Sequence, residues 1–180
     1  MKRLFAVLCC VALCSIPAMA KARAAAKTGM TDQQFVDFAA QTDMVESNLG
    51  KLAQNVAASQ QVKDYGQMLV TDHEKDLQHL KDIAQQNNLT VPDAIDALHN
   101  KTTIGPFHKL SGAAFDHRYI PAMISGHTAA IKIYKKEAAD AQDAALKSYA
   151  EDALPVLQKH LDAAEALQKG KPITTYLAEP

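Results

Sequence analysis

The sequence contains no tryptophan, and only seven glycines and seven prolines are spread over its 180 residues. All three cysteines, Cys9, Cys10 and Cys14, lie near the N-terminus, so the chain after residue 20 has no thiol. A disulfide or a thiolate metal site is therefore excluded there. The formal net charge of −1 gives no indication of binding to nucleic acid or to an anionic membrane surface. Alanine, leucine, lysine, glutamine and aspartate are abundant instead, a composition typical of helices.

The first twenty residues have the pattern of a secretory signal peptide. An apolar run, Leu4–Ile16, follows two basic residues and leads to an A-x-A pattern that ends at Ala20. This run is too short to span a bilayer, and no later apolar run is long enough to do so. We therefore expect residues 1–20 to be a cleaved signal peptide and residues 21–30 to be a flexible leader. The mature chain is then exported, with the periplasm as the expected compartment.

Four long stretches carry apolar residues at alternating three- and four-residue steps, the pattern of helices that pack in a bundle. We predict that these helices begin near Thr31, Ser59, Ser111 and Asp143, and that Gly170 ends the last of them. Two prolines, Pro121 and Pro155, fall inside the last two helices, and each is expected to bend its helix.

A long connection, Leu89–Leu110, separates the second and third predicted helices. We expect a short helix at Asp93–Leu98 and a break at Gly105-Pro106 within it. Connections of this length are uncommon in compact domains, and in helix bundles they carry the chain from one end to the other. The prediction is an all-α, ferritin-like antiparallel four-helix bundle at residues 31–170, with this crossover and a flexible tail at residues 171–180.

Each predicted helix places one metal-ligating type of residue on or beside the face that should be buried. Three histidines, His73, His127 and His160, lie on the apolar stripes, and Glu46 lies at the edge of its own stripe. A buried carboxylate without a partner is costly, and a cation held among neutral imidazoles offsets that cost. We therefore predict that these four side chains bind a single divalent transition metal. Zinc, iron, manganese, copper and nickel all accept such ligands, and the pattern does not distinguish them.

Several neighbouring residues receive weaker assignments. Asp72 and Asp76 flank His73 and are candidates to orient its second ring nitrogen. Asp116 is too far from His127 along the same helix to share an ion, and we expect it to partner a tyrosine or to cap a helix. The remaining histidines lie off the apolar stripes, and we expect them to be solvated: His79, His99, His108 and His117.

Several segments together resemble a bacterial family known as domain of unknown function 4142. The segments are Phe35–Ala53, Met68–His73, Leu110–Asp116 with Tyr119 and His127, and Leu154-Pro155 with His160. The resemblance covers about residues 30–169 and implies an exported, ferritin-like four-helix bundle, often labelled a predicted outer membrane protein. It implies no settled activity.

The ferritin-like comparison does not extend to the usual di-iron site. Such sites use a Glu-x-x-His motif on each of two helices. The residues three positions before the stripe histidines are Val70, Ile124 and Leu157, whose side chains cannot ligate a metal. A two-iron oxidase or iron store of the usual kind is therefore not expected.

Three functions remain open on the sequence alone. The first is a metal-binding protein that acts in metal handling or stress tolerance. The second is an enzyme that uses the bound metal, such as an oxidase or a peroxide-consuming protein, which would need an open coordination position. The third is a metal-free envelope interaction protein in which the Glu–His cluster is structural, because a single histidine on an apolar stripe is usually a satisfied core residue. The sequence does not identify a substrate, a protein partner or an oligomeric state.

Overall fold

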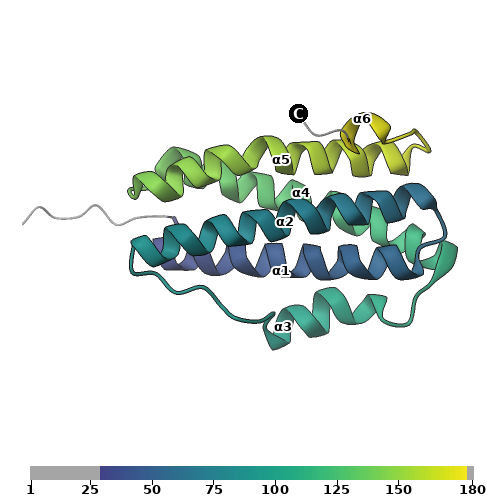
Figure 1. The fold of residues 1–180 in the computed structure, drawn as a ribbon, viewed down its shortest axis with the longest axis horizontal. Coiled ribbons are helices and arrows are strands. Elements are labelled where there is room, and N and C mark those ends of the chain that lie inside the picture. The colour runs from purple at the N-terminus through teal and green to yellow at the C-terminus, as the bar shows by residue number, and fades with distance from the viewer. Residues whose placement is uncertain (1–28, 178–180) are drawn as a thin grey trace, which may run out of the picture.

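A computed structural model describes residues 29–177 of the chain as four long helices joined by turns and one helical crossover (Figure 1). The long helices are α1 (Asp32–Val56), α2 (Gln60–Gln86), α4 (Gly112–Asp140) and α5 (Ala144–Gln168). The crossover contains α3 (Ala97–His99), a π-helical turn (Asn100–Ile104) and a 3₁₀ turn (Gly105–Phe107), and α6 (Thr174–Leu177) follows α5. The predicted signal peptide and nearly all of the predicted leader lie outside the described residues.

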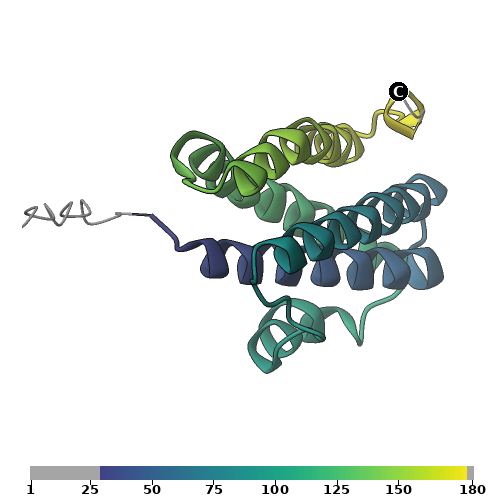
Figure 2. The ribbon, with the colours of Figure 1, turned by 60° about the vertical axis from the view of Figure 1, so that its left-hand side comes forward.

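The helices are arranged as two antiparallel pairs, α1 with α2 and α4 with α5 (Figures 1 and 2). The crossover runs along the bundle from one end to the other, so α2 and α4 point in the same direction. The predicted all-α antiparallel bundle with a long crossover between its second and third long helices is confirmed. Within residues 29–177, none of the helices combines the length and the hydrophobicity needed to cross a bilayer.

Local sequence signals explain the helix boundaries. Thr31 and Gln34 form a capping box at α1, in which each side chain binds the other residue's backbone N–H at 3.2 and 2.9 Å. Asp143 caps α5 by accepting from two backbone N–H groups of the first turn. Gly170, which follows the C-cap residue Lys169 of α5, has a φ of +64°, the left-handed conformation that glycine adopts at low cost.

The crossover differs from its prediction in two places. The predicted helix at Asp93–Leu98 is wrong, because helical structure begins only at Ala97, after Asp96 caps it by accepting from the backbone N–H of His99 at 2.8 Å. The Gly105-Pro106 pair was expected to break the chain's helical path and instead starts a 3₁₀ turn. Proline is tolerated there because the first turn of a helix does not need its N–H.

Asp116 connects the start of α4 to the turn between α1 and α2. Its carboxylate accepts hydrogen bonds from the backbone N–H groups of Ala58 at 3.1 Å and Ser59 at 2.9 Å. Asp116 was expected to partner a tyrosine or to cap a helix; it binds instead the backbone of the turn just before α2, at the N-cap residue Ser59 and the residue before it. At this end of α4 the fully buried positions are Phe115 and Tyr119.

The segment after α5, which we expected to be flexible, packs against the bundle as far as residue 177. Ile173 is buried, and its backbone N–H donates to the Gln61 side chain on α2 at 3.1 Å. The short helix α6 contacts both α2 and α5.

The buried interior consists of two apolar clusters with a polar layer between them. One cluster occupies the end of the bundle near the α1–α2 turn and includes Tyr65, Phe115 and Tyr119. The other occupies the opposite end and includes Phe35 and Tyr149. The helix segments between the two clusters carry the buried histidines and carboxylates described next.

Candidate metal centre

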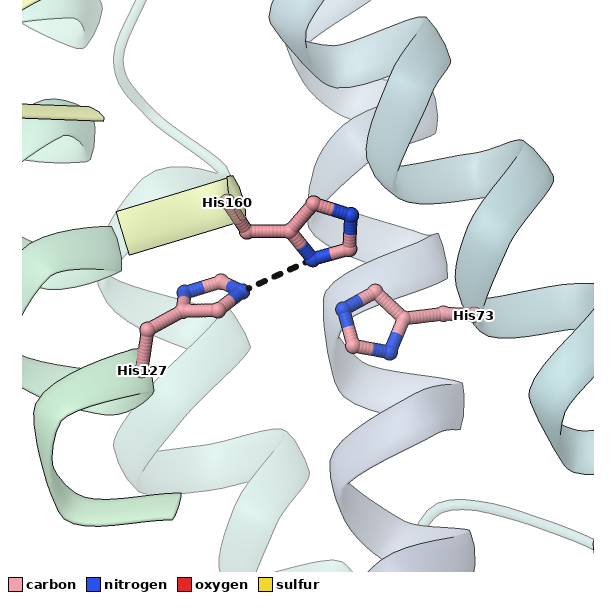
Figure 3. A group of neighbouring side chains, drawn as sticks. All are labelled: His73, His127 and His160. Atoms are coloured by element: carbon pink, nitrogen blue, oxygen red, sulfur yellow. Dashed lines mark hydrogen bonds between the residues drawn. The ribbon is translucent and has the colours of Figure 1, made fainter. Parts of the chain in front are cut away.

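Three histidines from three helices meet in the polar layer at the middle of the bundle (Figure 3). His73 comes from α2, His127 from α4 and His160 from α5, and their exposed fractions are 3%, 1% and 0%. Each offers one ring nitrogen, and these nitrogens all lie within 4.8 Å of one another. The fold therefore brings together three of the four side chains that were predicted to bind a metal.

Each of these histidines is oriented by an oxygen atom that contacts one of its two ring nitrogens. The contacts are His73 Nδ1 to Asp43 Oδ1 at 2.9 Å, His127 Nδ1 to the Met123 carbonyl oxygen at 2.9 Å, and His160 Nε2 to Asp72 Oδ2 at 2.8 Å. A ring nitrogen must carry a proton to donate to a carbonyl or an ionised carboxylate. The other nitrogen of each neutral ring then presents a lone pair, which is the form of histidine that binds metals.

When the three rings are neutral, there are not enough ring N–H protons for every nitrogen of the cluster to take part in a hydrogen bond. His127 Nε2 lies 3.3 Å from His160 Nδ1. With His127 donating to Met123 and His160 donating to Asp72, both of these nitrogens present lone pairs. His73 Nε2 is buried and has no hydrogen-bond partner among the described residues. The cluster therefore has three lone-pair positions and no proton shared between them.

The electrostatics keep two of the three rings neutral. Burial lowers the pKa of His127 well below its ordinary value, and the neighbouring His160 and His73 lower it further. Burial also lowers the pKa of His160 to about 4, although the contact with Asp72 opposes this. The Asp72 pKa is held at about 2, because the bonds from His160 and Lys159 outweigh the effect of its partial burial.

The pKa values of His73 and Asp43 are both raised above the ordinary values of these groups. Burial raises the pKa of Asp43 to about 7, against the lowering effect of His73. Burial lowers the pKa of His73, but the hydrogen bond and charge of Asp43, together with the charge of Glu46, outweigh it and raise the pKa above 6.5. The pair therefore holds a proton near neutral pH that the other two histidines do not.

Glu46 does not join the group of mutually close ligand atoms. Its side chain is 7% exposed, and its Oε2 atom has no hydrogen-bond partner among the described residues. Burial raises its pKa to about 7, with an opposing effect from His73. The carboxylate lines a cleft of about 540 Å³ between α1, α4 and the crossover. It therefore lies beside the histidine cluster and keeps one buried oxygen free.

The predicted orienting residues hold different partners from those expected. Neither Asp72 nor Asp76 hydrogen-bonds to His73: Asp72 holds His160, and Asp76 accepts from the Tyr149 hydroxyl at 2.7 Å. The residue that orients His73 is Asp43, which sequence reasoning missed. A signal was present, because Asp43 precedes Glu46 by three residues and so lies on the same face of α1.

The other histidines lie away from the cluster. His79, His108 and His117 are exposed, as expected, and His99 contacts Asp96 within the crossover with a side chain that is 42% exposed.

The chemistry of the donor set fits a transition-metal ion. Imidazole nitrogen lies about 2.0–2.1 Å from zinc and similar ions, so two ligating nitrogens stand roughly 3.4 Å apart. The ring nitrogens, at most 4.8 Å apart, would need to approach one another by up to about 1.4 Å, within reach of side-chain adjustment. Three protein ligands also leave a coordination position open.

Comparison with solved structures finds the same fold in CopM. The Cu(II)-bound form has a TM-score of 0.67 and 16% identity, and covers 79% of this chain and 98% of that chain. The Cu(I)-bound form has a TM-score of 0.66 and 16% identity, with 78% and 97% coverage. The silver-bound form has a TM-score of 0.61 and 17% identity, again with 78% and 97% coverage.

Identities this low show a shared fold. No protein with a curated description matches the sequence. A family model matches residues 17–167, which is most of the chain and confirms the resemblance seen in the sequence. The chain therefore belongs to the family described as Domain of unknown function (DUF4142).

Proposed function

We propose that this protein binds a single copper ion through His73, His127 and His160 and serves in metal handling. The observation that carries the proposal is that each of three buried rings has one nitrogen held by an oxygen and offers a nitrogen within 4.8 Å of those of the other two rings. In the neutral form of each ring, the nitrogen that is not held by the oxygen has a lone pair for a metal. A purely structural cluster would share protons between the rings. Instead, His73 Nε2 has no partner among residues 29–177, and the two nitrogens of the His127–His160 contact are both acceptors when the rings are neutral and donate to Met123 and Asp72.

Copper is favoured over the other ions that imidazole accepts. The structures with the same fold hold Cu(II), Cu(I) and silver, as their names state. Among divalent first-row ions, a nitrogen site also generally binds Cu(II) most tightly. The chain after residue 20 offers no thiolate, so the selectivity must come from the imidazoles and their surroundings.

Nearby carboxylates balance the charge of a bound ion. Three neutral imidazoles leave the full charge of a buried cation uncompensated, which is costly in a low-dielectric interior. Asp43 and Asp72 contact the outer nitrogens of two ligand rings, a typical arrangement around metal-bound histidine. Glu46 has a free buried oxygen beside the cluster and is our proposed fourth ligand, reached by rotation of its side chain.

The setting of this function follows from the N-terminal pattern. A signal peptide at residues 1–20 would deliver the protein to the periplasm, where a metal-handling or stress-tolerance role requires no thiol. Export is tested by finding the mature chain in the periplasmic fraction with its N-terminus after residue 20.

The test of the proposal is a metal titration of protein purified without an affinity tag. We expect one equivalent of copper to bind in competition with a chelator of known affinity. A His73→Ala, His160→Ala double variant should lose this binding. A double variant at the exposed His79 and His108 should retain it and thus serves as the control. Equal copper content in wild type and the His73/His160 variant would contradict the proposal.

A second candidate function is catalysis at the same ion. The observation in its favour is the 540 Å³ cleft lined by Glu46, because a substrate in this cleft would take the fourth coordination position when Glu46 does not occupy it. Copper-loaded protein whose absorption spectrum changes with azide, and which consumes peroxide, would support an enzyme. A spectrum unaffected by either would restrict the role to binding.

A further inference from the structure

Two clefts approach the histidine cluster from the two sides of α1. The larger, which we call the α4 cleft, has a volume of about 540 Å³, and its lining includes Glu46, Thr103, Phe107, Arg118, Met123 and Gly126. The smaller, which we call the α2 cleft, has a volume of about 290 Å³, and its lining includes Asp43, Ser47, Lys51, His73, Glu74 and Ala94. Both are bordered by the crossover, so an ion from solvent has two candidate routes to the cluster.

Each carboxylate of the α2 cleft has one oxygen atom engaged by a partner. Glu74 forms an ion pair with Lys51 at 2.6 Å and accepts a hydrogen bond from Ser47 at 3.2 Å. Asp43 Oδ1 contacts Nδ1 of His73, so it holds the protonated side of that ring. Asp43 Oδ2, like Glu46 Oε2, is buried and has no partner among residues 29–177. A cation that enters the α2 cleft meets the Lys51 ammonium, however, and the nitrogen of His73 that faces Asp43 carries the proton of the neutral ring and offers no lone pair.

The α4 cleft ends on a carboxylate that is free to bind. Glu46 lines this cleft, and its buried Oε2 has no partner among residues 29–177. The absence of a side chain at Gly126 leaves room for the Glu46 carboxylate. A Cβ at position 126 would stand only 3.2 Å from Glu46 Oε1. Both Gly126 and Met123 connect directly to the cluster, since Gly126 precedes His127 and the Met123 carbonyl holds its Nδ1 atom.

We propose that the α4 cleft is the route by which the metal ion enters and leaves, with Glu46 as a transfer ligand between solvent and the three histidines. This inference rests on the proposed metal-binding function and adds the path. A hard carboxylate oxygen binds an incoming hydrated cation, and the imidazole nitrogens behind it then replace the remaining water. Glu46 therefore sets the rate at which the metal ion exchanges with solvent, in addition to any contribution that it makes to the final affinity.

Arg118 supplies an opposing charge on this route. Its guanidinium lies 5.8 Å from the centre of the Phe107 ring, and both residues line the cleft. A fixed positive charge slows the approach of a cation, and the effect weakens with added salt. Removal of this charge should accelerate loading only if the ion passes through the α4 cleft.

A matched pair of variants tests the route, and the chain has no tryptophan of its own to complicate the signal. Thr103→Trp places an indole in the α4 cleft, and Ala94→Trp places one in the α2 cleft. Cu(II) uptake is followed by quenching of the protein fluorescence in a stopped-flow instrument, from the native tyrosines in wild type and from these together with the indole in each Trp variant. Release is followed after addition of excess chelator. We expect Thr103→Trp to slow both rates about tenfold, because the ion must wait for the crossover or the indole to move. The dissociation constant should be unchanged, and Ala94→Trp should load at the wild-type rate.

Two further variants keep the test informative if an indole disturbs folding. Glu46→Gln leaves the cleft open and should slow uptake, whereas Arg118→Gln should accelerate uptake at low salt and lose that advantage at high salt. Wild-type loading rates in Thr103→Trp and Arg118→Gln, or slowing in Ala94→Trp alone, would overturn the route while leaving copper binding intact. Failure of wild type to bind Cu(II) would overturn the proposed function and, with it, the route.

Discussion

His127 Nε2 lies 3.3 Å from His160 Nδ1, and with the second nitrogen of each ring donating to an oxygen, neither atom has a proton to share. Two lone pairs at this separation repel each other, and the contact persists because packed helices on both sides hold the rings in place. A cation between the two nitrogens would turn the repulsion into two coordinate bonds. The metal-free bundle is therefore organised for an ion at this point.

The first prediction concerns the carboxylate that holds His160. Asp72→Asn removes the charge that fixes the ring through Nε2, and loss of such an orienting partner typically lowers metal affinity about 10–100-fold. Copper affinity is measured by competition with a chelator. Asp162→Asn is the control, because this exposed carboxylate lies on α5, the helix of His160, and accepts a hydrogen bond from Gln158. Equal affinities in the two variants would show that Asp72 does not position the ring.

The second prediction concerns the close approach of α1 and α2. A Cβ added at Gly50 would stand 2.6 Å from the backbone oxygen of Gly66, which cannot move without shifting the helix. We expect Gly50→Ala to lower the free energy of unfolding by about 2 kcal/mol, in the range of overpacked cores.

Gly126→Ala is the matched control for this prediction. The nearest atom to its added methyl group is the end of the Glu46 side chain, which can move, and alanine favours a helix more than glycine does. This variant should unfold at the same denaturant concentration as wild type or at a higher one. A Gly50→Ala protein as stable as wild type would contradict the tight contact between α1 and α2.

Sequence periodicity was sufficient for the bundle because each long helix has one apolar face and a recognisable cap. The same periodicity placed His73, His127 and His160 on buried faces, and their meeting needed only similar depths along the helices. It could not show which neighbours orient the rings. Asp72 is adjacent to His73 in sequence but turns toward His160 on a different helix, a contact fixed by the packing of α2 against α5.

The crossover was harder to predict than the long helices. Its helical turn is positioned by Asp96 as a cap and by the burial of Ile104 and Phe107 against the bundle. These tertiary contacts override the local preference of proline and glycine to interrupt a helix, which is why the shape of the α4 cleft could not be read from the sequence.

The third prediction concerns the stability cost of Glu46 in metal-free protein. Its pKa is raised from 4.5 to about 7 by burial, so its contribution to stability is present below pH 4.5 and is lost as the pH rises through 7. One pKa unit corresponds to about 1.4 kcal/mol, so ionisation of this buried group costs about 3 kcal/mol. Glu46→Gln should therefore unfold at a higher denaturant concentration than wild type at pH 8.5, with only a small difference at pH 5.

Glu151→Gln, at an exposed position on α5, controls for the change in net charge and should show no such pH dependence. The Glu46→Gln variant should also bind copper more weakly, so that greater stability accompanies poorer binding. A stability gain that is the same at both pH values would mean that Glu46 does not titrate as a buried acid.

The last prediction concerns the protons that copper must displace. Asp43 and Glu46 raise the pKa of His73 above 6.5, so near pH 6 this ring carries a proton on the nitrogen that the metal needs. His127 and His160 have lowered pKa values and are already neutral there, so they contribute no proton. Copper binding at pH 6 should therefore release at least one proton, with further release from the Asp43 and Glu46 carboxyls, whose pKa values are about 7. At pH 9 the release should approach zero.

Titration calorimetry in two buffers of different ionisation enthalpy measures this release. Asp43→Asn removes the main group that raises the pKa of His73, so it should release fewer protons at pH 6 than wild type.

The stability added by copper is present above the pKa of His73 in metal-free protein and fades as the pH falls through it. The melting temperatures of loaded and metal-free protein should differ at pH 7.5 and converge by about pH 5. Proton release that is independent of pH, or a melting difference that persists unchanged at pH 5, would show that His73 is not a ligand.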